Sequence, residues 1–237
     1  MSAPLVFLPG WALGRGPLAA TAAALAGQFI DLPGYRETPP MADFDIAVDA
    51  IASRLPAGAA LAGWSIGAQL ALAVAARHPD KVGKLLLIAG TCSFVQRDGW
   101  PHAMPPATLA DFAAAIGVDA AGMLPRFVGG FNRGDAQARE VTRQILDLAD
   151  PLPGPEVLAA GLNWLRDVDL RADAPQVRAP TLLLHGDADP LMPAAAARML
   201  AALIPDARLE LLPACAHAPF LSRPEDCLAA AHRFLHD

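Results

Sequence analysis

The feature that most constrains this chain is a serine with a glycine two positions away on either side. Gly63-Trp64-Ser65-Ile66-Gly67 follows an apolar run, Ala59 to Gly63, and precedes a segment with helical spacing. A G-x-S-x-G motif in that setting is typical of a sharp, strained turn that exposes the serine hydroxyl. An unassisted hydroxyl is a poor nucleophile, so the motif predicts a base and an acid elsewhere in the chain.

The acid is expected after a late strand, because the partners of such a serine follow in the order acid, then histidine. Thr181–Leu184 predicts a buried strand, and two aspartates follow it within His185-Gly-Asp-Ala-Asp-Pro190. Asp189 is the predicted acid because it lies further past the strand end. Asp187 is the alternative. The acid would hold the tautomer of the histidine and stabilise its charged form.

The base is predicted to be His217. It follows another predicted strand, Arg208–Leu212, and precedes the closing helix, and it is the only histidine placed in such a loop. The candidate triad is therefore Ser65, Asp189 and His217. Acyl transfer also needs two N–H donors for the developing oxyanion. We expect them from Ile66, directly after the serine, and from Trp11, in the loop after the first apolar run.

Short apolar runs alternate with helical patterns, except between residues 92 and 176. Such alternation predicts an α/β fold with a mostly parallel central sheet and helices on both faces. Residues 1–91 and 177–237 would form this core. Residues 92–176 lose the alternation and are expected to form an inserted helical cap, with helical patterns at 107–116, 120–131, 136–149 and 155–165. Ser222-Arg-Pro-Glu225 predicts a capping box at the start of the last helix.

Composition excludes several other classes of protein. The chain is 54% hydrophobic and 18% charged, which suits a folded domain, and its net charge of −6 argues against general nucleic-acid binding. No apolar stretch is expected to reach the length of about 18 residues that a membrane span needs. The start lacks the pattern of a secretory signal, and the three cysteines are too widely spaced for a disulfide framework. We therefore expect a cytoplasmic protein without a membrane partner.

Together these motifs make the chain similar to the α/β-hydrolase superfamily, over nearly its whole length. Within it, the chain most resembles the carboxylesterases of biotin synthesis that demethylate pimeloyl-acyl-carrier-protein methyl ester. That resemblance rests on segments spread along the chain: LPGW at 8–11, DLPGY at 31–35, GWSIG at 63–67, HPDKV at 78–82, NWLRDVDLR at 163–171, GDADPLMP at 186–193 and AHAPF at 216–220. Proline stands at position 9 where many members have histidine.

The resemblance implies an ester hydrolase that needs no cofactor and no metal. It implies that the substrate is bound by Trp11, Ser65, Ile66, Phe127, Phe131 and His217. Arg126, Arg139 and Arg143 match cap arginines that meet the acidic acyl-carrier protein. The residues agree in outline, because positions 126–143 hold four arginines in an otherwise acidic chain, and Arg139 and Arg143 share one helix face. We expect a monomer.

Two other functions stay open at this point. A general esterase of small acyl esters, or a carbon–carbon bond hydrolase, could use the same triad. A binding protein could use the same fold as a receptor without catalysis; an intact triad does not exclude it, and it is the less favoured alternative.

Overall fold

The computed structural model describes residues 3–236. Within that range one sheet of six strands, all parallel to their neighbours, runs through the molecule in the order β2-β1-β3-β4-β5-β6. Its strands are β1 (Leu5–Leu8), β2 (Gln28–Phe29), β3 (Ala59–Trp64), β4 (Val82–Ile88), β5 (Thr181–Gly186) and β6 (Ala207–Leu212). Every residue of β1, β3 and β5 is buried, as expected of parallel strands that are covered on both faces.

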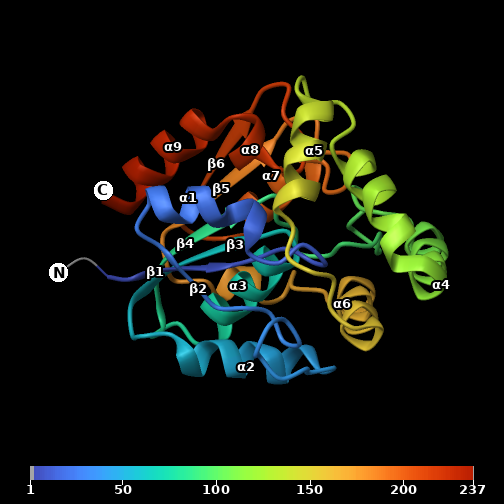
Figure 1. Cartoon of the computed structure of the whole chain (residues 1–237). Helices are drawn as coiled ribbons and strands as arrows, with labels where there is room; N and C mark the ends of the chain where they lie inside the picture. The colour runs from blue at the N-terminus through green and yellow to red at the C-terminus, as the bar shows by residue number, and fades with distance from the viewer. Residues whose placement is uncertain (1–2, 237) are drawn as a thin grey trace.

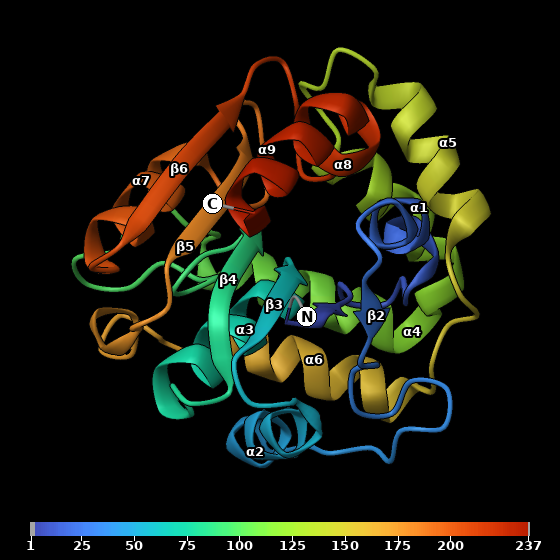
Figure 2. The same ribbon diagram turned by 90° about the vertical axis from the view of Figure 1, so that its left-hand side faces the viewer.

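Helices cover both faces of this sheet (Figures 1 and 2). One face carries α1 (Ala19–Ala24) and α9 (Pro224–His236), which contact each other. The other face carries α2 (Phe44–Arg54), α3 (Ile66–Arg77) and α7 (Ala194–Leu203). Short turns of helix complete these layers: η1 (Gly16–Leu18), η2 (Ala174–Gln176) and α8 (Pro219–Ser222). The sequence patterns did not predict α1 or α8.

The direction of strand succession reverses between β1 and β3. The chain passes from β1 to the edge strand β2 and then returns to place β3 on the other side of β1. The loops that leave the carboxyl ends of β1 and β3 therefore diverge, and such a switch point is where open parallel sheets commonly bind ligands. Pro9-Gly10-Trp11 and Ser65 both lie in these loops.

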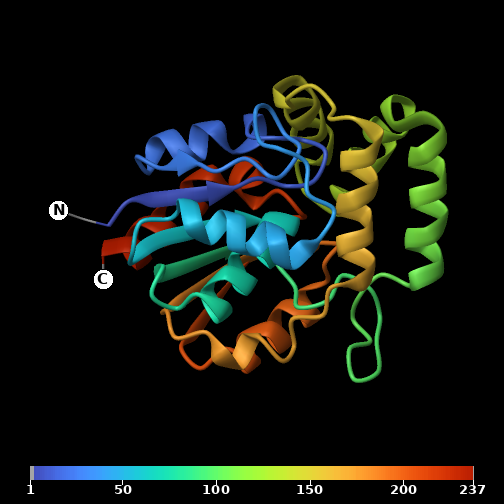
Figure 3. The same ribbon diagram turned by 90° about the horizontal axis from the view of Figure 1, so that it is seen from below.

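Three longer helices follow β4 and precede β5: α4 (Pro106–Phe131), α5 (Ala138–Leu148) and α6 (Pro155–Asp167). Figures 1 and 3 show them together at the end of the molecule opposite the two termini, beyond the carboxyl ends of the strands. Two tryptophan side chains attach α6 to the rest of the chain. Trp11 donates to the Leu158 carbonyl at 3.0 Å, and Trp164 donates to the Ala42 carbonyl at 2.7 Å.

Helix α4 corrects the expectation that no apolar stretch reaches the length of a membrane span. By length and composition it is apolar enough to cross a membrane, and little of it is buried. The patterns at 107–116 and 120–131 are its two arms, joined at Asp119, whose φ of −149° and ψ of 81° are not helical. At about 1.5 Å per residue, each arm is shorter than the roughly 30 Å of a bilayer core.

The predicted capping box is wrong. Ser222 closes α8, and its buried hydroxyl donates to Asp135 at 2.8 Å. The last helix then begins at Pro224, after Arg223. The Ser222 hydroxyl bonds to the carboxylate of Asp135, which is distant in the sequence, and so does not cap the last helix. The local pattern Ser222-Arg-Pro-Glu225 does not reveal this contact.

Candidate active site

Ser65 occupies a strained turn between a buried strand and a buried helix. Strand β3 ends at Trp64 and α3 begins at Ile66, so Ser65 alone makes the connection. Its φ of 59° and ψ of −121° lie outside the regions that side-chain-bearing residues favour. Such strain persists only where the surrounding structure enforces it, and it concentrates at functional sites.

The two glycines of the motif allow this turn because other backbone segments pass against them. A Cβ atom on Gly67 would overlap the carbonyl oxygens of Leu8 and Pro9, and one on Gly63 would overlap the carbonyl oxygen of Gly67. The start of α3 therefore packs directly on the loop after β1. The glycines bring Ser65 and that loop into one site.

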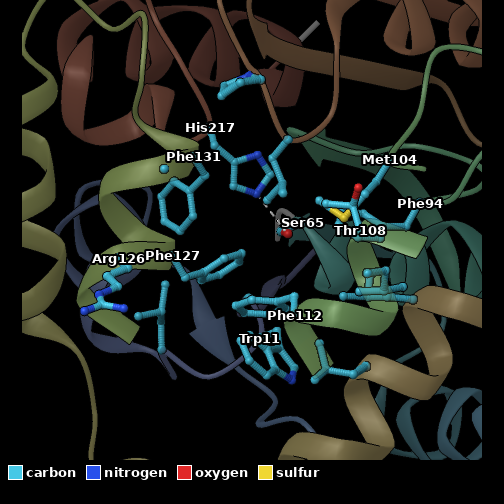
Figure 4. A pocket seen from close by; sticks show the side chains of 18 of the residues that line it. Trp11, Ser65, Phe94, Met104, Thr108, Phe112, Arg126, Phe127, Phe131 and His217 are labelled. Carbon is cyan, nitrogen blue, oxygen red and sulfur yellow. Dashed lines mark hydrogen bonds between the residues drawn. The ribbon is translucent and has the colours of Figure 1, made fainter. Parts of the chain in front are cut away.

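Hydrogen bonds connect Ser65 to His217 and His217 to Asp189. His217 Nε2 lies 3.0 Å from Ser65 Oγ (Figure 4). His217 Nδ1 lies 2.7 Å from Asp189 Oδ2. The histidine and the aspartate are both buried. A carboxylate at Nδ1 favours the tautomer that carries its proton there, which leaves Nε2 free to accept the serine proton.

The structure places Asp189, and not Asp187, against the histidine. Asp187 is exposed at the end of β5. The other oxygen of Asp189 accepts the N–H groups of Leu191 at 2.8 Å and Met192 at 2.9 Å. These donors stabilise the ionised carboxylate and fix its orientation toward His217.

A second histidine, His185, lies behind the acid. It is fully buried, and burial lowers its pKa below the ordinary value, so it is neutral near pH 7. Its Nε2 lies 2.6 Å from the Met192 carbonyl and 3.6 Å from Asp189 Oδ2. The short contact to the carbonyl is a hydrogen bond, whereas the longer approach to Asp189 is no ion pair while the ring is neutral.

Ser65 and His217 open onto an apolar cavity of about 430 Å³. That volume lies in the range of small-ligand sites. Aromatic rings, among them Trp11, Phe112, Phe127 and Phe131, form much of its wall (Figure 4). Trp11 packs edge-on against Phe112 and Phe127, with ring centroids 5.8 and 5.5 Å apart, and Phe131 lies 5.1 Å from His217. The cavity suits an extended hydrocarbon chain that ends at the serine.

The two predicted oxyanion donors follow the carboxyl ends of two neighbouring strands, β3 for Ile66 and β1 for Trp11. Ile66 is the first residue of α3, where backbone N–H groups lack partners within the helix. Trp11 follows β1, next to the point where Gly67 packs on Pro9. The ring of Trp11 is buried and tied to α6, so the side chain and the backbone of this residue have separate contacts.

The predicted docking arginines are all exposed but differ in their surroundings. Arg126 lines the cavity, together with Arg133, which the sequence did not single out. Arg143 forms ion pairs with Glu140 and Asp147, each at 2.6 Å. Among the described residues Arg139 has no such partner. The positive patch is therefore weaker around Arg143 than the sequence suggested.

Other polar groups offer no obvious metal site. Residues 3–236 contain no cluster of three or more histidine, cysteine, aspartate or glutamate side chains that could hold a metal ion. The cysteines are buried and unpaired, and burial raises the pKa of Cys92 and of Cys215 to about 12. These thiols stay protonated near neutral pH, where they are poor nucleophiles.

Comparison with known proteins identifies the family. The sequence profile of the "Alpha/beta hydrolase family" matches residues 5–230. The chain belongs to this alpha/beta hydrolase family. The expected fold is thereby confirmed, including the central parallel sheet with helices on both faces.

This hydrolase is similar in sequence to several curated relatives. It is 40% identical to the pimeloyl-[acyl-carrier protein] methyl ester esterase of Aromatoleum aromaticum, over 94% of both chains. It is 39% identical to the protein of the same name from Nitrosomonas europaea, over 93% of this chain and 91% of the relative. The family resemblance predicted from the motifs is therefore confirmed.

Solved structures share the fold of this hydrolase at lower identity. An esterase from Exiguobacterium antarcticum superposes with a TM-score of 0.87 at 24% identity, covering 100% of this chain and 92% of that one. A bromoperoxidase from Bacillus anthracis gives the same TM-score at 19% identity, covering 100% and 93%. An esterase and a bromoperoxidase that share one fold illustrate that the reaction depends on the site and not on the fold.

Several residues of the cavity escaped the sequence analysis. The apolar lining comes mainly from residues 92–176, and helical spacing does not distinguish a cavity wall from a core face. The residues concerned include Phe94, Met104, Leu109, Phe112, Met123 and Leu162.

Proposed function

We propose that this hydrolase is a serine carboxylesterase of biotin biosynthesis. It hydrolyses the methyl ester of pimeloyl-acyl-carrier protein to pimeloyl-acyl-carrier protein and methanol. The observation that carries the proposal is the hydrogen-bonded series Ser65–His217–Asp189 at one end of an apolar cavity. The relatives named for this reaction, which the chain matches over more than nine-tenths of its length, support the choice of substrate.

The first half of the reaction makes an ester on the serine. Ser65 Oγ attacks the carbonyl carbon of the methyl ester while His217 Nε2 accepts the hydroxyl proton. The charge that develops on the carbonyl oxygen is held by the N–H groups of Trp11 and Ile66. The bond from that carbon to the methoxy oxygen then breaks, and His217 gives its proton to this oxygen, so methanol leaves.

The second half reverses these roles with water. His217 removes a proton from a water molecule, whose oxygen attacks the acyl carbon of the Ser65 ester. The bond to Ser65 Oγ breaks, the serine recovers its proton from His217, and the carboxylic acid is released. Asp189 accepts the hydrogen bond from Nδ1 throughout and stabilises the imidazolium that forms in each half.

Residues 92–176 are proposed to form a cap that binds the acyl chain and selects it by its length and apolar character. Phe127 and Phe131 of α4 line the cavity beside Ser65, where they would contact the methylene groups of the pimeloyl chain. Burial of those methylenes contributes about 0.8 kcal/mol each to binding. The substrate would lie among Trp11, Ser65, Ile66, Phe127, Phe131 and His217.

The same cap is proposed to dock the carrier protein through Arg126, Arg139 and Arg143. Acyl-carrier protein is an acidic partner, and exposed guanidinium groups would speed its encounter and orient it. Arg126 lies at the cavity itself, so it would act where the acyl chain enters. We further propose that the enzyme works as a cytoplasmic monomer, without a nucleic-acid or membrane partner.

The proposal is tested by comparing kcat/KM on three esters: pimeloyl-acyl-carrier-protein methyl ester, free dimethyl pimelate and a short p-nitrophenyl ester. Ser65→Ala is the blank. A strong preference for the carrier-bound ester is expected. Equal rates on carrier-bound and free esters would refute carrier recognition and leave a general esterase. The absence of turnover on all three would refute the esterase.

A further inference from the structure

One buried carboxylate has no part in the chemistry described above. Asp135 lies in the turn between α4 and α5 and is largely hidden from solvent. Its Oδ1 accepts from Gln137 N at 2.7 Å and from Ser222 Oγ at 2.8 Å, and its Oδ2 accepts from Ala216 N at 2.8 Å. No ion pair of the described residues involves it. The charge is stabilised by three neutral donors, which is the arrangement that a buried carboxylate requires.

Two of these bonds involve residues that lie just before and shortly after His217, the candidate base, in the chain. Ala216 directly precedes His217 in the chain, and Ser222 ends the short helix α8 that follows it. A fourth contact joins the same segments, since Ala136 N donates to the Ala214 carbonyl at 2.9 Å. Ala214 has a φ of +53°, so the loop is also bent sharply at this point. The turn after α4 is therefore hydrogen-bonded to the loop that carries His217 and to the helix that follows it.

The opposite side of His217 is held by a residue of the core. Trp64 Nε1 donates to the His217 carbonyl at 2.9 Å, and Asp189 holds the imidazole ring. The N–H of Ala216, the carbonyl of His217 and the imidazole ring are thus each fixed by a different element. Only the N–H is fixed from the inserted segment, through Asp135.

From this arrangement we propose that Asp135 is a positioning residue. It holds the Ala214–His217 loop in the position that keeps His217 Nε2 within hydrogen-bond distance of Ser65 Oγ. Catalysis therefore depends on the position of the α4–α5 turn. The proposal rests on the triad proposed above. Asp135 touches neither the serine nor the imidazole, so its loss should affect the chemical step more than the binding of substrate.

Asp135→Asn is the informative variant because it keeps the size of the side chain. Its amide would turn an N–H toward Ala216 N or toward Gln137 N, so one donor must move away. We expect kcat to fall about tenfold or more with KM within about twofold, because an interaction that acts on the transition state alone lowers kcat. The rate at which a fluorophosphonate labels Ser65 should fall by the same factor. The downfield proton resonance of His217 Nδ1–H should shift or broaden.

Gln137→Ala is the matched control. Gln137 Nε2 donates to the Ser222 carbonyl at 2.7 Å, so this variant also removes a bond from the same turn to α8 but none to the loop at Ala216. Its kcat should stay within about twofold of the unaltered enzyme. Should Asp135→Asn give too little folded protein, Ser222→Ala removes one of the donors to Asp135, and its kcat should fall below that of Gln137→Ala.

Equal kcat values in Asp135→Asn and Gln137→Ala would overturn the positioning role, and so would a loss confined to KM. If the unaltered enzyme itself neither hydrolyses esters nor reacts with the fluorophosphonate, the proposed function fails instead. The two failures are therefore distinguishable.

Discussion

The indole N–H of Trp64 donates a 2.9 Å hydrogen bond to the backbone carbonyl of His217. The residue that precedes the serine in the chain thus holds the backbone of the histidine that faces that serine. Trp64 also packs edge-on against Phe220, with ring centroids 5.0 Å apart. The tryptophan of the GWSIG motif is therefore part of the framework of the site.

Trp64→Phe should separate these two contributions, since it keeps an aromatic ring and removes the donor. The buried carbonyl of His217 would lose its partner, which costs about 1–3 kcal/mol in the free energy of unfolding. Urea denaturation measures this loss, and turnover of a p-nitrophenyl ester measures the effect on the site. A variant as stable as the unaltered protein would show that the hydrogen bond contributes nothing.

Ser65→Ala should abolish turnover without unfolding the protein. The side chain is small and, among residues 3–236, its hydroxyl bonds only to His217, so the fold loses little, while the proposed nucleophile is lost completely. We expect kcat to fall by roughly 10⁴-fold or more. Circular dichroism and thermal unfolding serve as controls. Retention of most of the activity would mean that Ser65 is not the nucleophile.

Charge reversal at Arg139 should slow the carrier-bound substrate and spare small esters. Arg143→Glu should have the weaker effect, because the existing charge of Arg143 is already matched by Glu140 and Asp147. The quantity to compare is kcat/KM on carrier-bound and free methyl esters at low salt, where exposed charges act most strongly. Arg198→Glu, at an exposed position on α7, is the control for net charge. Equal losses in all three variants would exclude a local docking site.

His185 should make the stability of the protein depend on pH. Its pKa is lowered by burial in the folded state and is about 6.5 in the unfolded chain. The unfolded chain therefore binds the proton first as the pH falls. The contribution of His185 is fully present above about pH 6.5 and is lost as the pH drops toward the folded pKa.

His185→Gln tests this linkage, because glutamine can still donate to the Met192 carbonyl but does not titrate. Between pH 8 and pH 5, the midpoint of urea unfolding should fall more steeply for the unaltered protein than for the variant. Asp189 and His217, which face His185, are present in both proteins, so the difference in slope belongs to His185. Parallel slopes would contradict the prediction.

Local patterns predicted the fold well where one segment determines its own structure. A few neighbouring residues are enough to recognise the turn at Ser65, the buried strands, and the loops after β5 and β6. Their meeting follows from the parallel sheet, since the carboxyl ends of all its strands share one edge. The contacts among Ser65, Asp189 and His217 agree with the residues chosen from the sequence, and their catalytic roles remain predictions.

Long-range contacts were beyond the reach of these patterns. Asp135 reads in the sequence as one polar residue in a turn, and its partners Ala216 and Ser222 lie 81 and 87 positions away. Ser222 was assigned to a helix cap because its own neighbours fit that motif. The two helical patterns of α4 were separated because a periodic pattern does not show whether a kink ends a helix or only bends it.

The hydrogen bonds between the α4–α5 turn and the Ala214–His217 loop limit how this enzyme can be re-engineered. A designer who exchanges all of residues 92–176 for the cap of another hydrolase removes Asp135 and Gln137 along with the proposed acyl-binding surface. A graft restricted to residues 106–131 would replace most of the cavity-lining residues that residues 92–176 contribute and retain both side chains. Substrate range and catalytic competence can then be exchanged separately, with the boundary of the transplant drawn just before Asn132.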